Sequence, residues 1–576
     1  MKRMKQRLGA TLATALVLLP LMTPVAHAQA STDDLIAPHR AQYGYYVDNY
    51  KNSTYDNTNP ITNPADGLLS NFSKYWSPTK GQLNPSILNQ NTAISARITQ
   101  TRTAAEVKRS YLTDWRDLAY SLIAGLGPFE SAFIKNADAK TAYMDLPAAP
   151  DPAHKPYSGV RWADPNSKLG DMVKLVNVVR GRFGSAGTPK HYYQYQRPYR
   201  LSPDVLPNPY LNNVMRAAGK ADYDFPSGHT TAGFEAGEAF AYAFPERFQQ
   251  LITRSSEVGY DRILAGRHSP LATMGGRMLG TAVVASVLND PANKDLMKQA
   301  YAEAHSSNLQ TSPLVNAHDD YSSYRENQKN YRYRMTYNLP QIGAKGLAPR
   351  VPKGAEVLLA TRLPYLSNDQ RRMALATTEI QSGYPLLDDV EGWGRLDLFS
   401  AANGYGALPS TTKVNMDATK GGFNAKDVWR NNMTGTGKLV KQGTGDLALN
   451  GNNQFTGGVQ VDGGNLTLNN ANAAGKGDVK LTDGTLSAPV TVKLQRGYQQ
   501  AQRGTLALTT TKTTALKIHG KAKLAGTLRL TNLAGLKNHQ SLITFGSHQG
   551  KFSHVYGLPK GWHVTYTAHK LELVRG

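Results

Sequence analysis

The segment "DFPSGHTTAG", residues 224–233, places a proline, a serine, a glycine and a histidine directly before a run of small residues. The Pro-Ser-Gly corner ends any preceding element, and "HTTAGFEAGEAFAYAF" predicts a helix of small and aromatic residues. Ser227, the Gly228 amide and His229 then lie at a helix N-terminus, where free N–H groups and the helix dipole favour an anion. Taken alone, the pattern also fits a capped helix with a surface histidine.

Charged residues on both sides of the corner extend this anion-binding pattern. Upstream, "KHYYQYQRPYR" carries Lys190 and Arg197, and downstream "YDRILAGRHSPLATMGGR" carries Arg262 and His268. Fixed cations and aligned N–H groups suit a phosphoryl group, because its negative charge spreads over the equatorial oxygens during transfer. One histidine can attack phosphorus while the other serves the leaving oxygen, so we expect no metal and no other cofactor.

The order and spacing of these residues resemble the signature of the type 2 phosphatidic acid phosphatase superfamily: Lys-x6-Arg-Pro, Pro-Ser-Gly-His and Ser-Arg-x5-His-x3-Asp. Residues 186–305 are most similar to the bacterial class A acid phosphatases, a secreted, all-helical, metal-independent branch that hydrolyses phosphate monoesters. The resemblance implies that His268 is a nucleophile that forms phosphohistidine, and that His229 protonates the leaving group and then activates water. It also implies five phosphate-binding residues: Lys190, Arg197, Ser227, Gly228 and Arg262.

Two positions depart from that signature. Asp261 stands where the family has serine, and Ala272 stands where the family has the Asp that orients the nucleophilic imidazole. Asp261 precedes His268 by seven residues, about 10 Å along a helix, which makes it a poor replacement. We therefore expect weakened turnover with phosphate binding retained, and a gain of at least about tenfold on Ala272→Asp.

The N-terminus and the composition indicate an exported protein. Residues 1–28 combine a basic stretch, an apolar run and a small-residue "AHA" site, which predicts a secretory signal peptide. The net charge of +23 includes four basic residues and no acid in that leader. No later stretch reaches the length of about 18 apolar residues that spans a bilayer, so we expect no transmembrane anchor. The chain has no cysteine, which excludes disulfides and cysteine nucleophiles.

The remaining chain divides by composition into three predicted regions. Residues 31–340 are mainly helical and carry the phosphatase-like motifs, and residues 341–404 form a C-terminal extension with Ser367 as an expected helix cap. Residues 405–576 are rich in Gly, Asn and Thr, with alternating aliphatic residues typical of strands. We expect a multidomain protein, with an all-α phosphatase domain followed by an all-β domain.

The third region repeats with a period of about 20 residues. Leu447 and Leu449 recur as Leu466 and Leu468, and the pair Val459 and Val461 recurs as Val479 and Leu481. Such repeats predict a β-solenoid, with a β-sandwich as the alternative. The segment "GTGKLVKQGTGDLALNGNNQFTGGVQVDGGNLTLNN" resembles the autotransporter-associated β-strand repeat, and the last segment resembles those that close such solenoids. No membrane β-barrel, sortase-type anchor or final hydrophobic helix is recognisable after it.

The same region concentrates positive charge, with 21 Lys and Arg residues against seven Asp and Glu residues. This balance favours an anionic partner such as a cell-wall polymer. Nucleic acid fits the charge too, but no binding motif supports it.

The sequence thus predicts a secreted phosphatase carried on a basic solenoid and acting on phosphate monoesters. Two alternatives stay open: a vanadium-dependent haloperoxidase, whose site shares these motifs, and a catalytically impaired phosphate-binding surface protein.

Overall fold

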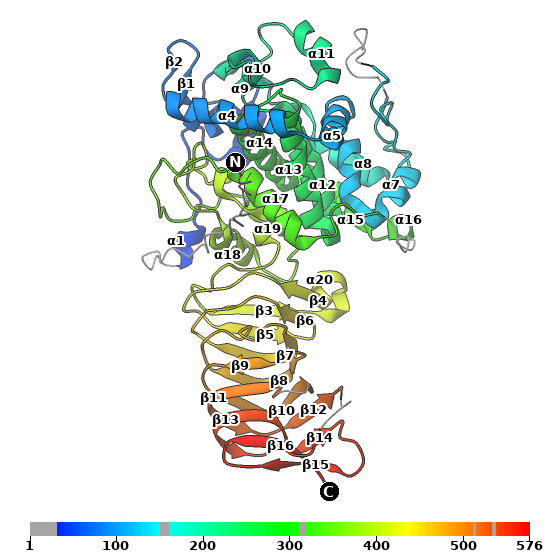
Figure 1. Ribbon diagram of the computed structural model, residues 1–576, viewed down its shortest axis with the longest axis vertical. Helices are drawn as coiled ribbons and strands as arrows, with labels where there is room; N and C mark the ends of the chain where they lie inside the picture. Colours follow the sequence, from blue (N-terminus) through cyan, green and yellow to red (C-terminus); the bar gives the residue numbers. More distant parts are fainter. Residues whose placement is uncertain (1–31, 150–159, 311–317, 511–513, 533–536) are drawn as a thin grey trace, which may run out of the picture.

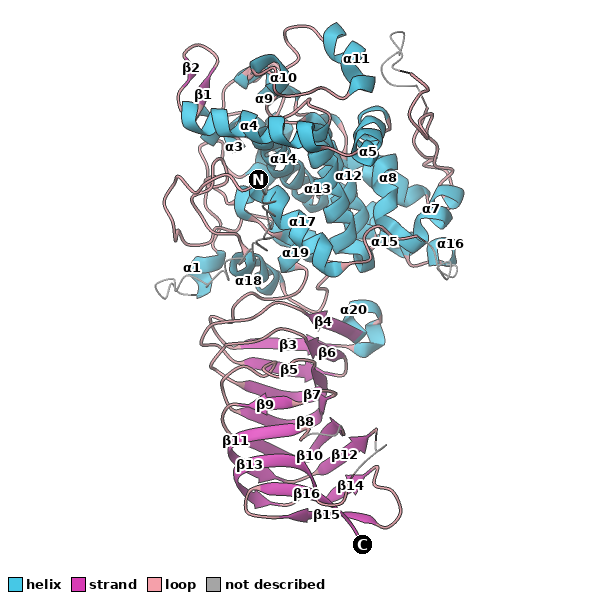
Figure 2. Cartoon of the chain, viewed as in Figure 1, coloured by secondary structure: helices cyan, strands magenta, loops and turns pink. Residues whose placement is uncertain are grey.

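The computed structural model describes residues 32–149, 160–310, 318–510, 514–532 and 537–576. Helices occupy the first part of the chain and strands the second (Figure 2). Figure 1 shows the helices as one body and the strands as a stacked column that extends from it. The expected leader, residues 1–28, lies outside the described residues.

Three helices form the centre of the helical body: α12 (Gly228–Ala243), α13 (Phe248–Leu264) and α14 (Pro270–Asn289). Two glycines of α14 explain how closely it approaches α12. A Cβ atom at Gly276 would lie 2.6 Å from the Ser227 carbonyl oxygen, and one at Gly280 would lie 2.6 Å from that of Thr231. Because only glycine permits this approach, the start of α14 lies against the Pro-Ser-Gly corner.

Helix α14 is longer and more apolar than the sequence analysis indicated. It has the length and composition of a membrane-spanning helix, with a mean hydropathy of 1.4 over an 18-residue window. The expectation that no such stretch follows the leader is therefore corrected. All of that window is buried inside the helical body, as is usual for the core helix of a folded domain.

Other helices surround the central three. They are α1 (Thr32–Ile36), α2 (Tyr46–Asn49), α3 (Pro64–Leu68), α4 (Pro85–Thr101), α5 (Ala104–Trp115), α6 (Leu118–Leu122), α7 (Glu130–Asn136), α8 (Gly170–Val179), α9 (Gly187–Tyr193), α10 (Pro198–Leu201), α11 (Asn212–Ala217), α15 (Lys294–Ala304), α16 (Ser307–Gln310) and α17 (Tyr324–Thr336). A short hairpin, β1 (Trp76–Ser77) with β2 (Gly81–Gln82), lies beside them. The helical fold predicted for this part is confirmed.

The extension over residues 341–404 adds α18 (Asn368–Thr378) and α19 (Leu398–Ala401) to the base of the helical body. Ser367 caps α18 as predicted, since its side chain accepts the Gln370 N–H in a capping box. The extension also contacts the central helices, because the Arg277 side chain on α14 donates to the Gly394 carbonyl at 2.7 Å.

The strands of the second part form a β-solenoid. They are β3 (Thr412–Met416), β4 (Lys426–Trp429), β5 (Leu439–Gly443), β6 (Asp446–Leu449), β7 (Val459–Leu468), β8 (Val479–Ala488), β9 (Val492–Leu494), β10 (Tyr498–Thr509), β11 (Leu516–Leu524), β12 (Thr527–Thr531), β13 (Gln540–Gly550), β14 (His554–Tyr556), β15 (Trp562–Tyr566) and β16 (Lys570–Arg575). One short helix, α20 (Gly422–Ala425), precedes β4.

The sequence repeat matches the pairing register between neighbouring strands of this solenoid. Leu447 pairs with Leu466 and Leu449 with Leu468 between the parallel strands β6 and β7. The strands from β3 to β14 pair in parallel, which excludes the sandwich alternative, because sandwich sheets are antiparallel. The last strands, β13, β16 and β15, pair antiparallel and close the stack. Each rung buries its aliphatic residues against the next, as the period predicts.

A buried polar group joins the first solenoid turn to the helical extension. Asp427 on β4 accepts hydrogen bonds from the Arg362 guanidinium at 2.7 Å and from the Tyr365 hydroxyl at 2.5 Å. The Trp429 indole N–H donates to the same hydroxyl at 2.8 Å, and the Trp429 ring lies 5.4 Å from that of Tyr405. The two parts of the chain therefore share buried side chains at their junction.

Candidate active site

The corner at residues 224–229 opens α12 as the sequence predicts. Ser227 is the N-cap, and its hydroxyl accepts the Thr230 N–H at 3.3 Å while its own N–H donates to the Ala272 carbonyl at 2.8 Å. Gly228 is the first residue of the helix, and a Cβ atom there would lie 3.9 Å from the Lys190 side chain. The amides at the start of α12 are thus beside the first predicted cation.

The predicted cations come from three separate helical elements. Lys190 lies on α9, Arg197 caps α10, and Arg262 lies on the last turn of α13. The Lys190 ammonium donates to the Tyr223 carbonyl at 2.7 Å, just before the corner. The Arg197 guanidinium contacts His268, with Nη1 at 2.5 Å from Nε2. The fold therefore gathers these cations around the corner and the predicted nucleophile.

Two carboxylates hold the arginines in place. Asp222 forms an ion pair with Arg197, and Asp114 on α5 forms one with Arg262, which is completely buried. Arg267 approaches both carboxylates, with N–O distances of 3.2 Å to Asp114 and 3.8 Å to Asp222. Four cations thus share the site with three nearby carboxylates, counting Asp224, before any substrate is bound. The ion pairs thus fix the positions of these guanidinium groups, which suits them to bind an anion.

His268 lies in the short connection between α13 and α14 and is nearly completely buried. Its Nδ1 is 2.9 Å from Oδ1 of Asp224, and its Nε2 faces Arg197. A guanidinium has only donors, so Nε2 accepts that bond and Nδ1 carries the proton. This tautomer leaves the Nε2 lone pair on the side where the cations gather.

The expectation that Ala272 deprives His268 of an acceptor is wrong. Asp224, two residues before the corner proline, supplies a carboxylate at the orienting nitrogen. Asp261 does not take this part, because it accepts bonds from Arg109 at 2.7 Å and Thr113 at 2.7 Å, away from the imidazole. The physical basis for weakened turnover is therefore absent, and we no longer expect Ala272→Asp alone to raise activity.

His229 is the second residue of α12, where its ring lies near Asp114. Its Nε2 is 3.3 Å from the Asp114 carbonyl oxygen. Burial and the neighbouring Arg262 guanidinium hold the pKa of His229 well below its usual range. A dianion bound among these cations would offset their charge and raise that pKa, which would favour the protonated form that a general acid needs.

Burial and the adjacent Arg197 and Lys190 also hold the pKa of His268 well below its usual range. The imidazole is thus neutral at neutral pH, as a nucleophile must be. Burial raises the pKa of Asp224 to about 6, while Arg197 and two Ser269 hydrogen bonds oppose that rise. Above that pH, Asp224 is an anion beside the Nδ1–H group.

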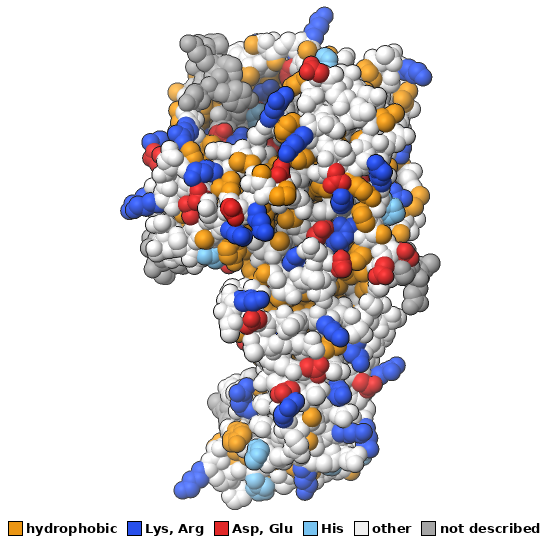
Figure 3. Space-filling model, turned by 180° about the vertical axis from the view of Figure 1, so that it is seen from behind, with side chains coloured by type: hydrophobic (Ala, Val, Ile, Leu, Met, Phe, Trp, Pro, Cys, Tyr) orange, Lys and Arg blue, Asp and Glu red, His pale blue; other side chains and the backbone are white. Residues whose placement is uncertain are grey.

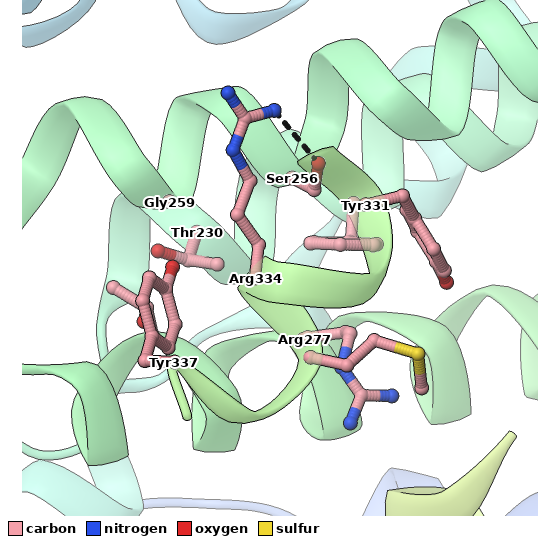
Figure 4. A pocket seen from close by; sticks show the side chains of 10 residues that line it. Thr230, Ser256, Gly259, Arg277, Tyr331, Arg334 and Tyr337 are labelled. Carbon is pink, nitrogen blue, oxygen red and sulfur yellow. Dashed lines mark hydrogen bonds between the residues drawn. The ribbon is translucent and has the colours of Figure 1, made fainter. Parts of the chain in front are cut away.

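The cavity drawn in Figure 4 lies on another face of α12. Its lining includes Thr230, Gly259, Arg277, Arg334 and Tyr337, so it shares none of the seven predicted site residues. The Arg334 side chain donates to the Ser256 hydroxyl at 3.2 Å inside it. Among the described residues, no three His, Asp or Glu side chains form a group that could hold a metal ion.

Four charged residues of the site were missed by sequence reasoning: Asp114, Asp222, Asp224 and Arg267. Asp222 and Asp224 stand within five residues of the corner proline, so their proximity to the motif was a usable signal. Asp114 lies 115 residues before His229, and no local pattern connects the two.

Family models match two parts of the chain. Residues 172–295 match the PAP2 superfamily model, and that range includes all seven predicted site residues. The helical part therefore carries a PAP2 superfamily domain, and residues 439–468 match the passenger-associated-transport-repeat.

Individual relatives fall into two groups. Over 138 residues, 24% of this chain, it is 29% identical to the non-specific acid phosphatase of Salmonella typhimurium and covers 53% of that protein. Over 222 residues, 34% of this chain, it is 32% identical to the autotransporter lipoprotein NalP of Neisseria meningitidis serogroup B and covers 20% of it. The adhesin BmaC autotransporter of Brucella suis is 34% identical over 139 residues, 24% of this chain and 4% of BmaC. The chain thus spans about half of the first relative and a small part of the others. The repeat and the autotransporter relatives indicate a protein of the outer membrane or the extracellular space.

Proposed function

We propose that this protein is an exported phosphatase that hydrolyses phosphate monoesters through a phosphohistidine at His268. The observation that carries the proposal is the geometry at His268, whose Nε2 faces the Arg197 guanidinium and whose Nδ1 lies 2.9 Å from the Asp224 carboxylate. The PAP2 superfamily match and the likeness to a non-specific acid phosphatase support the same chemistry.

In the first step, the phosphate of the ester is held by the fixed cations and the amides at the start of α12. The Arg197 guanidinium transfers its hydrogen bond from Nε2 to a phosphate oxygen, which uncovers the nucleophile. The Nε2 lone pair attacks phosphorus, the ester P–O bond breaks, and the leaving oxygen takes a proton from His229. Lys190 and Arg262 stabilise the charge that spreads over the equatorial oxygens.

In the second step, water replaces the alcohol. Neutral His229 takes a proton from the water, whose oxygen attacks phosphorus as the P–N bond returns its electron pair to Nε2. Phosphate leaves, and both histidines return to their starting protonation states. No metal or other cofactor enters the proposed cycle, because the arginines and the lysine supply the positive charge.

Hydrolysis of an aryl phosphate by the purified chain tests the proposal. We expect turnover that EDTA leaves unchanged and that vanadate inhibits competitively, because vanadate takes the geometry of the transferred phosphoryl group. Loss of activity in EDTA with recovery on adding a divalent cation would refute the metal-independent cycle. Vanadate binding without turnover would favour the impaired binding protein, and peroxide-dependent halide oxidation with bound vanadate would favour the haloperoxidase.

We further propose that the solenoid holds the enzyme at anionic surface polymers. Residues 405–576 carry 21 Lys and Arg against seven Asp and Glu, and Figure 3 shows Lys and Arg side chains spread over one face of the solenoid. We expect the full chain to bind isolated anionic cell-wall polymer and to release it as salt rises from about 0.05 to 0.5 M, because screening shortens the range of the attraction. Binding that salt does not weaken would contradict this proposal.

A further inference from the structure

The orienting carboxylate of His268 comes from an unexpected place in the chain. The resemblance leads one to look four residues after the histidine, at Ala272, whose side chain is apolar and completely buried. The carboxylate that contacts Nδ1 belongs instead to Asp224, 44 residues before His268, at 2.9 Å.

Asp224 is held as firmly as an orienting group must be. The side chain is completely buried, and Oδ1 also accepts the Ser269 N–H at 3.2 Å while Oδ2 accepts the Ser269 hydroxyl at 2.5 Å. Its backbone N–H donates to the Tyr195 carbonyl at 2.7 Å. Three donors on one carboxylate leave it a single orientation, which in turn sets the plane of the imidazole.

Other acceptors are already committed to different partners. The Ala272 carbonyl accepts the Ser227 N–H, and Asp222 is paired with Arg197. Asp261 is paired with Arg109 and Arg254. Asp224 is thus the acceptor that the geometry offers to Nδ1.

We propose that Asp224 is the positioning residue of the nucleophile, and that it replaces, from the segment before the corner, the carboxylate that related enzymes place after the histidine. This proposal rests on the proposed function for its catalytic meaning. Asp224 selects the Nδ1–H tautomer and stabilises the positive charge that the imidazole gains while Nε2 is bonded to phosphorus.

The first measurement does not depend on activity. In ¹⁵N-histidine-labelled protein, we expect the His268 signals of the free protein to report Nδ1 as protonated and Nε2 as unprotonated. Loss of those signals in His268→Ala assigns them. In Asp224→Asn we expect the tautomer distribution to change, because the amide can donate to Nδ1. Unchanged His268 signals in this variant would overturn the proposal, whether or not the protein is a phosphatase.

The second measurement is kinetic. We expect Asp224→Asn to lower kcat by about 10³- to 10⁴-fold, by analogy of role with the triad aspartate of serine proteases, while the inhibition constant of vanadate changes less than about threefold. The acid limb of kcat/KM should move to lower pH, because removing an anion beside the imidazole lowers its pKa. A native kcat in Asp224→Asn, or an equal loss of vanadate binding, would overturn the positioning role.

Moving the carboxylate from position 224 to position 272 tests whether Asp224 positions His268 or only supports the fold. We expect the double variant Asp224→Ala with Ala272→Asp to be at least about tenfold faster than Asp224→Ala alone, since it returns a carboxylate to the position that relatives use. Asp261→Asn is the matched control, a buried carboxylate of the same domain that does not contact His268, and we expect its kcat within about threefold of native. A loss in this control as large as that in Asp224→Asn would show that any buried carboxylate matters and would contradict the proposal. If native protein lacks turnover while the tautomer depends on Asp224, the proposed function fails and the positioning stands.

Discussion

Replacing His268 by alanine is expected to abolish phosphomonoester hydrolysis, with kcat lowered by about 10⁴-fold or more. The reason is that Nε2 of His268, which faces Arg197, is the atom proposed to attack phosphorus, whereas His229 is assigned to the leaving oxygen and lies near Asp114. Binding of vanadate should persist in weakened form, because the predicted cations and the amides of α12 remain. The measurement is a rapid-quench experiment with aryl phosphate labelled in its phosphoryl group. We expect the native protein to bind the label covalently through an alkali-stable, acid-labile bond, and the His268→Ala protein to bind none.

The companion variant His229→Ala separates the two histidines. With a leaving group that needs little protonation, the first step should continue while the activation of water is lost, so labelled phosphoenzyme should accumulate. His191→Ala is the control, since that histidine is exposed on α9 and is expected to leave kcat unchanged. Covalent label on the His268→Ala protein, or on His229→Ala at a residue other than His268, would contradict the assignment of the nucleophile.

Replacing Asp427 by alanine is expected to lower the free energy of unfolding by about 3–5 kcal/mol, because it leaves the Arg362 guanidinium buried without its counter-charge. The Arg362 and Asp427 side chains are 9% and 2% exposed, so water cannot take the place of the lost partner. Chemical denaturation followed by tryptophan fluorescence is suited to this site, since Trp429 lies two residues away and is completely buried.

Two further variants define the cause of that loss. The double replacement Arg362→Met with Asp427→Leu removes both charges and should recover most of the stability. Asp48→Ala breaks an ion pair with Lys353 in which both side chains are 45% exposed, and it should cost less than about 1 kcal/mol. A loss of that small size in Asp427→Ala would mean that the junction does not depend on its buried charges.

Much of the fold could be predicted from local patterns. The helical period, the Pro-Ser-Gly corner and the cap at Ser367 each depend on residues within a few positions of one another, and the structure contains all three. The solenoid register follows from the 20-residue repeat, because each rung pairs with the next one along the chain. The length of α14 was underestimated, because glycines, threonines and an arginine interrupt an apolar stretch that is nevertheless buried throughout.

The candidate site, like the fold, could be predicted from the sequence only in part. Seven residues were assigned phosphate-binding or catalytic roles from their resemblance to a family signature. Contacts in the structure connect the Lys190, Arg197 and His268 positions to the corner. The carboxylates that hold these residues were not predicted from the sequence. One of them, Asp224, contacts His268, so the prediction that Ala272 leaves His268 without an acceptor was wrong.

The sequence by itself determined the residue types and their order: a cationic, histidine-containing motif at a helix N-terminus, followed by a repeat that can only be buried by stacking. Only the tertiary structure decided which acid serves which base. Asp224 reaches His268 across 44 residues, and Asp114 reaches Arg262 from a different helix, through contacts that arise when α5, α12, α13 and α14 pack together. Hydrogen bonds and ion pairs act over a few ångströms in space, whatever the separation along the chain, so their partners are settled by packing rather than by spacing.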